Sequence, residues 1–270
     1  MNKVFLFLIT FNIFLFADEH YAKLEPIETI LIKAEINGKV IKAKDELEGK
    51  VVDGLIVKID DTLDKTDLKH SKESLQLINK MIDINKNILP LLKKSYLKKR
   101  DLYQKVTPLS SSSVSQKESL YSAYVGAKNQ YNAVEEKILN LKNQKVSLEQ
   151  KIASLKDKIK KKSIIVKNRY LYELNIKSGE YVNIGMPIAT LQDISKAKLV
   201  IYLSEDEIKD IDNKSIYING KKSNLKFSKI WKVADKKYIS SYRAEILLKP
   251  FTNFSKLIKV EVKWYKQHVH

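Results

Sequence analysis

The 270-residue chain contains no cysteine, which excludes disulfides, thiolate metal sites, a cysteine nucleophile and a lipid-modified N-terminal cysteine. It has only seven glycines and five prolines, whereas 30% of its residues are charged. Hydrophobic residues make up 44% of the chain, enough to build a core. This composition favours an elongated protein with much helix surface over one large globule.

No pattern of catalytic residues stands out either. The sequence has no nucleophile elbow, no phosphate-binding loop and no pair of histidines at helical spacing. The carboxylate pairs Asp60-Asp61 and Glu205-Asp206 are expected to be turn residues and helix caps. We therefore predict a protein that is not an enzyme, with no metal and no cofactor. The four histidines are scattered and expected to be solvated: His20, His70, His268 and His270.

The net charge of +18 raises the question of nucleic-acid binding. However, the excess is mostly lysine spread over helix faces, and arginine occurs only at Arg100, Arg169 and Arg243. No basic run is interleaved with the aromatic side chains on which single-stranded nucleic acid stacks. The sequence therefore predicts no nucleic-acid partner, and leaves open an anionic membrane surface or an acidic protein.

Residues 1–17 have the pattern of an export signal. Lys3 is followed by an apolar stretch from Val4 to Phe16, and Ala17 supplies a small residue at a cleavage point. About 14 residues in a helix span ~21 Å, which is short of the ~30 Å hydrocarbon core of a bilayer. We expect cleavage after Ala17, with retention of the segment as an anchor as the open alternative.

The next part of the chain predicts short strands. Residues 27–34 alternate with dense β-branched content, and the apolar pairs and runs that follow are separated by Gly38, Gly49 and Gly54. Glycines at this spacing are typical of tight turns that need a positive φ. These glycines, with valines between them, therefore indicate a hairpin in a compact β-sandwich.

From Leu68 the apolar period changes to alternating threes and fours, the pattern of a helical coiled coil, and it returns after residues 107–113. Those residues include Pro108 and four serines, which predicts a turn. Residues 66–162 should thus form an antiparallel helical hairpin that projects ~60 Å, with a kink or break at Pro90. The predicted seam comprises Leu68, Leu75, Ile78, Ile82, Leu89, Leu92, Tyr96, Tyr103 and Val106 in the first helix, and Leu120, Tyr124, Ala127, Tyr131, Val134, Ile138, Leu141, Leu148, Ile152, Leu155 and Ile159 in the second.

After the hairpin, apolar strand patterns lead into Gly179-x-x-Val182-x-x-Gly185-x-Pro187. This motif resembles the second half of the lipoyl-like domain in periplasmic adaptors of the HlyD or membrane-fusion-protein family. The resemblance implies an elongated α+β fold, in which a lipoyl-like β-sandwich is interrupted by a long antiparallel α-helical coiled-coil hairpin and followed by a small β-barrel.

The resemblance also implies domain bounds. The two lipoyl-like halves would be residues 36–65 and 163–194, and the barrel would be residues 195–264 together with the strand 27–34. Glu48 stands where the family usually has a glycine, so the turn there is expected to differ. The residues expected in lipoyl-like turns are Gly38, Gly54, Gly179 and Gly185.

The function implied by the resemblance is that of an adaptor in the periplasm, peripherally attached to the inner membrane. Such a subunit would bridge an inner-membrane transporter of the RND or ABC type to a TolC-type outer-membrane channel, and would self-associate into a ring, with a hexamer as the expected size. The channel contact would lie at the hairpin tip, at Arg100, Val106 and Ser115, although the family's usual tip spacing is not matched after Arg100. The alternative is a structural coiled-coil protein of the envelope without a transport role.

Overall fold

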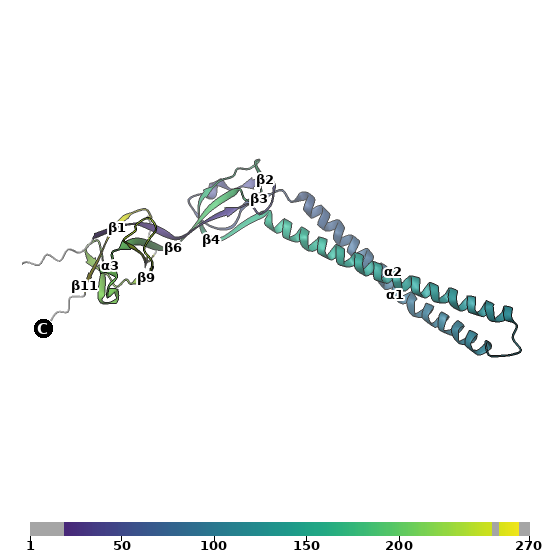
Figure 1. The fold of residues 1–270 in the computed structure, drawn as a ribbon. Helices are drawn as coiled ribbons and strands as arrows, with labels where there is room; N and C mark the ends of the chain where they lie inside the picture. Colours follow the sequence, from purple (N-terminus) through teal and green to yellow (C-terminus); the bar gives the residue numbers. More distant parts are fainter. Residues whose placement is uncertain (1–18, 250–253, 265–270) are drawn as a thin grey trace, which may run out of the picture.

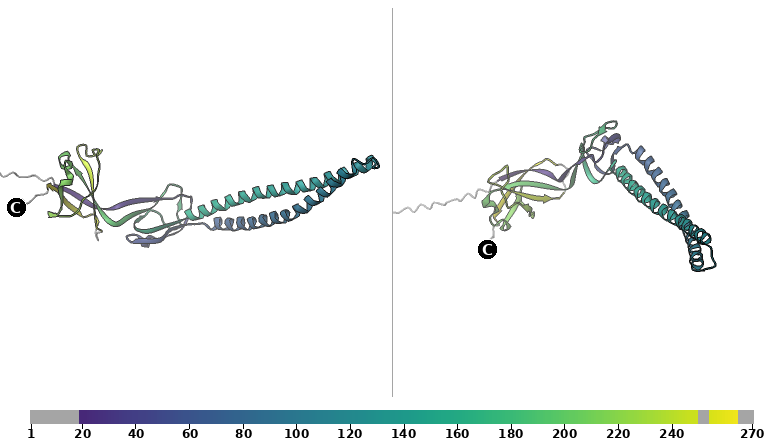
Figure 2. Two further views of the ribbon diagram at one scale, coloured as in Figure 1. Left: turned by 90° about the horizontal axis from the view of Figure 1, so that it is seen from below. Right: turned by 45° about the vertical axis from the view of Figure 1, so that its right-hand side comes forward.

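The computed structural model describes residues 19–249 and 254–264, so the predicted export signal lies outside the described residues. Figure 1 shows an elongated molecule in which a C-terminal β-unit, a small β-sandwich and a long helical hairpin follow one another. Figure 2 shows the same order from two further directions, with the hairpin tip at the end farthest from the C-terminal unit.

The hairpin consists of α1 (Thr62–Val106) and α2 (Val114–Lys161), of 45 and 48 residues. The side chains that are buried within it include Ile82, Ile138 and Ile152, all at predicted seam positions, because a 3-4 apolar spacing keeps one stripe of each helix against the other. The helix α1 continues through Pro90, so it is not broken there, and a kink at this residue stays a prediction. At 1.5 Å per residue, α1 is ~67 Å long.

The two predicted halves of the β-sandwich close into one core although the hairpin separates them in sequence. Gly38 of β2 pairs with Val182 of β5, and Val40 and Val182 are both fully buried in the same apolar cluster. Each half alone would expose an apolar sheet face, which explains why they join. The strands of this unit are β2 (Gly38–Ala43), β3 (Val51–Ile59), β4 (Ser163–Leu174), β5 (Tyr181–Val182) and the first part of β6 (Pro187–Leu203); the short 3-10 turn Asp45–Leu47 follows β2.

Gly38 is needed for close packing in this core. A Cβ atom at this position would lie 2.6 Å from Cγ2 of Ile59, which is itself fully buried. We expect Gly38→Ala to lower the free energy of unfolding by about 1–3 kcal/mol through overpacking. In the matched control Gly126→Ala, the new Cβ in α2 meets nothing within 4 Å and should stabilise the protein by about 0.5–1 kcal/mol. Thermal unfolding of both variants checks this prediction, and equal shifts would contradict it.

Gly54 does not lie in a turn as predicted. It lies inside β3 at φ +130°, opposite Val166, where the register with β4 shifts. An irregularity of this kind bends the strand and favours a glycine, as a turn does. The spacing of glycines in the sequence therefore does not distinguish a strand irregularity from a turn. Gly179 and Gly185, by contrast, lie in the turns before and after β5, both with positive φ.

The C-terminal β-unit has its own apolar core, which includes the fully buried Leu24, Leu199 and Ile246. Its strands run in the order β8, β7, β11, β1, β6, β10, β9. No pairing joins β8 to β9 within the described ranges, so the closed barrel stays a prediction. The further elements are α3 (Glu205–Ile208), a 3-10 turn (Ile211–Asn213), β7 (Lys214–Ile218), β8 (Lys221–Lys222), β9 (Phe227–Ile230), β10 (Tyr242–Leu248) and β11 (Leu257–Trp264).

The strand predicted at residues 27–34 as part of the barrel lies beside the sandwich instead. It is part of β1 (Glu19–Lys33), and residues 28–33 pair with residues 187–193 of β6 beside the sandwich, where Ala34 is buried. Only the earlier part of β1 contributes side chains to the C-terminal core, at Ala22 and Leu24. The assignment was wrong because β6 continues for 17 residues through both units, so β1 follows it across both.

Candidate docking site on the helical hairpin

The tip of the hairpin is a short turn that satisfies its own backbone groups. The Thr107 N–H donates to the Tyr103 carbonyl at 2.9 Å and ends α1. Across the turn, the Ser113 Oγ accepts from the Gln116 N–H at 3.2 Å and caps α2. Because these bonds are internal, the outward side chains of the tip are not needed to hold it together.

The structure brings two of the three predicted contact residues to the tip. Val106 is the last residue of α1 and is half-buried, and Ser115 is an exposed residue in the first turn of α2. Arg100 lies six residues before the end of α1, ~9 Å from it along the helix, and its Nη2 pairs with Asp101 Oδ1 at 2.9 Å. Arg100 is therefore on the side of the hairpin rather than at its end.

Two apolar residues at the tip were missed by the sequence reasoning. Leu109 and Val114 are 48% and 73% exposed, at the turn and at the start of α2. Both interrupt a run of hydroxyl side chains, and that is the signal that could have identified them. Below them, Tyr103 stacks on Tyr124 at 6.5 Å between ring centroids and meets Tyr121 at 5.3 Å, which braces the end of the hairpin.

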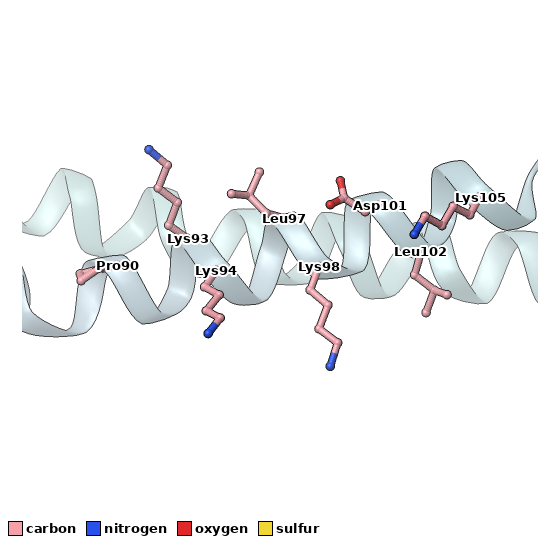
Figure 3. Close-up of a pocket in the computed structure, with 8 residues that line it drawn as sticks. All are labelled: Pro90, Lys93, Lys94, Leu97, Lys98, Asp101, Leu102 and Lys105. Atoms are coloured by element: carbon pink, nitrogen blue, oxygen red, sulfur yellow. The ribbon is translucent and has the colours of Figure 1, made fainter.

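The outer face of α1 near the tip is basic, and we call it the basic strip. Figure 3 shows its side chains pointing away from α1 around a shallow groove. Residues 90–106 hold six basic residues against the single acid Asp101, whereas residues 62–89 hold five lysines and four acids. Net positive charge is thus concentrated in the part of α1 nearest the tip. The groove is lined by Pro90, Lys93, Lys94, Leu97, Lys98, Asp101, Leu102 and Lys105.

A second feature of α1, which we call the apolar stripe, lies nearer the sandwich. It consists of five large apolar side chains that are spaced by fours and threes but do not face α2, and each is between 40% and 69% exposed. On α2, Leu139 and Val146 are 55% and 52% exposed and are seven residues apart. The members of the stripe are Leu77, Met81, Ile84, Ile88 and Leu91.

Ion pairs fix the base of the hairpin to the sandwich. Asp64 of α1 is buried and pairs with Lys158, at 2.7 Å, and with Lys162 at the end of α2. Asp61 is likewise buried and pairs with Lys58 of β3. Burial alone would raise the pKa of both carboxyls, but the lysine hydrogen bonds outweigh it and hold each pKa below its ordinary value. This cluster joins both helices to β3.

The cluster predicts acid sensitivity. A carboxyl whose pKa is lowered in the folded state contributes stability above its ordinary value of 3.8, and that contribution is lost as the pH falls through the folded pKa. We expect Asp61→Asn/Asp64→Asn to lower the free energy of unfolding at pH 7 by roughly 1–3 kcal/mol and to flatten its fall below pH 4. Thermal unfolding between pH 2 and 7 measures this. An unchanged acid profile in the double variant would show that other groups cause the loss.

The described part of the chain holds no group of three or more histidine, aspartate or glutamate side chains placed to bind a metal. Within the same residues, no helix combines the length and the apolar content that a membrane span requires.

Comparison with known proteins identifies the fold. MacA from Actinobacillus actinomycetemcomitans superposes with a TM-score of 0.70 at 17% identity, over 92% of this chain and 78% of that one. The membrane fusion protein Spr0693 from Streptococcus pneumoniae gives a TM-score of 0.61 at 9% identity, over 92% of this chain and the whole of that one. A MacA-MexA chimera that carries the Pseudomonas aeruginosa MexA α-hairpin domain gives 0.55 at 15% identity, over 92% and 79%. No family model and no curated protein matches. The chain thus has the fold of membrane fusion proteins.

Proposed function

We propose that this protein is the periplasmic adaptor of a tripartite efflux or secretion system. The observation that carries the proposal is the hairpin: more than 40 residues in each arm, pinned to a lipoyl-like sandwich at one end and closed by a self-capped turn at the other. A rod built this way can reach from one membrane-bound partner to another. The shared fold with a structure described as a membrane fusion protein supports this function.

The tip is the proposed contact with a TolC-type outer-membrane channel. Small hydroxyl side chains allow helices to approach closely, and the exposed Leu109 and Val114 supply apolar surface beside Val106 and Ser115. The basic strip extends this contact along α1. Among the described residues, none of its four lysines has an ion-pair partner, so an acidic channel surface would complement them. Arg100 would act in this lateral contact.

The apolar stripe is the proposed contact between copies of the chain. Five exposed apolar side chains in one row are unusual on a solvated helix, and Leu139 and Val146 of a neighbouring copy are of a kind that would pack against them. Side-by-side contacts that repeat by rotation close into a ring, and a hexamer is the size we propose. The ring would seat on an inner-membrane transporter of the RND or ABC type through the C-terminal β-unit.

Affinity purification from envelope membranes tests the proposed function. The tagged protein, cross-linked in cells before lysis, should copurify with both an inner-membrane transporter and an outer-membrane channel. A variant that carries Lys42→Glu and Lys177→Glu, in the sandwich and away from the hairpin, serves as the control and should retain both. Recovery of neither partner would favour a structural role in the envelope instead.

A further inference from the structure

The loop between β9 and β10 exposes apolar side chains more fully than any other large ones in the described part of the chain. Ile239 is 85% exposed and Val233 is 77% exposed. Tyr238, next to Ile239, is 44% exposed. Exposure of these two apolar side chains to water is unfavourable, so Val233 and Ile239 are candidates for contact with a partner or a membrane. We refer to residues 231–241 as the Trp231 loop.

The Trp231 loop is held in shape by its own hydrogen bonds. Asp235 donates its N–H to the Ser241 carbonyl at 2.8 Å, and its Oδ1 accepts from the N–H groups of Lys237, at 2.8 Å, and Tyr238, at 3.2 Å. The Tyr238 ring lies 4.3 Å from the Tyr202 ring between centroids, which attaches the loop to β6. The exposed position of Ile239 therefore belongs to an ordered turn, and the one carboxylate of the loop faces its backbone.

The surroundings of the two apolar side chains are basic and aromatic. Lys232, Lys236 and Lys237 are exposed within the loop. At its base, Lys229 and Arg243 lie over the Trp231 ring, at 5.1 Å and 4.7 Å from its centroid. Exposed apolar side chains, exposed lysines and a tryptophan within one loop are the combination that favours the interface of an anionic bilayer, where aromatic rings lie at headgroup level and lysines meet lipid phosphates.

The register of the sheet places the loop at one particular edge. Tyr242, directly after the loop, pairs with Leu203, the residue of β6 farthest along the chain from the sandwich. The start of β1 reaches the same edge, because Leu24 pairs with Leu199 and β1 runs antiparallel to β6. His20, near that start, contacts Glu207 of α3 at 2.6 Å. The loop thus shares an edge with Glu19 and His20, which come three and four residues after Phe16 in the sequence.

We propose that the Trp231 loop binds the surface of an anionic phospholipid bilayer, with Val233 and Ile239 inserted into the interface and the lysines on the headgroups. The acidic side chains of α3 follow Leu203 at the same edge and would repel anionic lipid. The electrostatic attraction to the bilayer therefore comes from the lysines of the loop and not from the whole edge. Lipid contact by this loop does not depend on a channel contact at the hairpin tip.

Vesicle flotation tests the proposal. The protein and its variants are purified from the exported fraction, so that the N-terminal segment has been processed in the same way in all of them. Wild type should float with vesicles that contain phosphatidylglycerol, and not with neutral phosphatidylcholine vesicles or in high salt. Val233→Ser/Ile239→Ser should weaken binding about tenfold or more, and Lys236→Glu/Lys237→Glu at least about 25-fold. Controls in the sandwich, Ile184→Ser and Lys42→Glu/Lys177→Glu, should bind as wild type.

A local probe excludes binding through another part of the chain. The sequence has two tryptophans, so Trp264→Phe leaves Trp231 as the only fluorophore of its kind. With anionic vesicles its emission should shift to the blue and be quenched by brominated lipid. The proposal is overturned if Trp231 is not quenched, if Val233→Ser/Ile239→Ser floats as well as wild type, or if wild type does not float at all.

Discussion

Replacing Val106 and Ser115 together by aspartate is expected to abolish channel association and export. The two carboxylates would be set against the helix tips of the channel, where burying an unpaired charge costs several kcal/mol. Val106 is half-buried and Ser115 exposed in the isolated chain, and the hydrogen bonds that close the turn involve neither side chain. The double variant should therefore unfold thermally as the wild type does, while self-association and transporter binding stay intact.

The matched control places the same charges elsewhere on the hairpin. Leu63, 72% exposed, and Ser74, also exposed, lie in α1 far from the tip. Leu63→Asp/Ser74→Asp should export at the wild-type rate. Export by the Val106→Asp/Ser115→Asp variant at that rate would show that the tip is not the channel contact and that the hairpin is only a spacer.

Replacing Ile84 and Ile88 by glutamate is expected to abolish self-association. These residues occupy the middle of the apolar stripe and are 58% and 40% exposed, so the folded monomer should tolerate the change. In the proposed contact between copies they would be buried, and the carboxylates would have no partner there. Analytical ultracentrifugation and cross-linking measure the assembly state.

A control for this variant lies on another face of the same stretch of helix. Gln76 and Lys86 are exposed, and neither is three or four residues from a member of the apolar stripe, so neither is its neighbour on the helix surface. Gln76→Glu/Lys86→Glu should assemble as wild type does. If Ile84→Glu/Ile88→Glu also assembles normally, copies of the chain meet through some other surface.

The hairpin was the part of the fold most open to prediction, because a coiled coil is encoded by local spacing. The predicted seam residues Ala127, Ile138, Leu141 and Leu155 are all buried. Two polar residues, Ser71 and Asn85, fall at the same spacing and are buried as well, and the Asn85 Nδ2 donates to the Met81 carbonyl at 2.6 Å. The periodicity thus predicts which residues face inward, even where they are polar.

Strand partners could not be predicted with the same success, because pairing is non-local. The alternation at residues 27–34 predicts a strand, but it does not reveal that β6 extends through two units and takes β1 with it. The pair of Asp64 and Lys162 joins residues 98 positions apart, and no local pattern connects them. Where a strand pairs with a distant segment, the sequence predicts that the strand exists, but its partner is known only from the structure.

Some of the candidate site was readable from the sequence but was missed. Leu77, Met81 and Ile84 repeat the 4-3 spacing of the seam on another face, so a second stripe was visible in the same stretch. The concentration of lysine after Pro90 was visible too. A coiled-coil pattern assigns all positions outside the seam to solvent, so it predicts neither the second apolar stripe nor the cluster of lysines.

Site-specific photo-cross-linking from the tip tests the proposed adaptor function most directly. A photoreactive residue in place of Val114, whose side chain is 73% exposed at the start of α2, samples what the tip touches in living cells. The proposal predicts a cross-link to an outer-membrane channel protein, and none from the same residue placed at Leu63. Cross-links only to other copies of the chain, or none from Val114, would contradict an adaptor that docks through its hairpin tip.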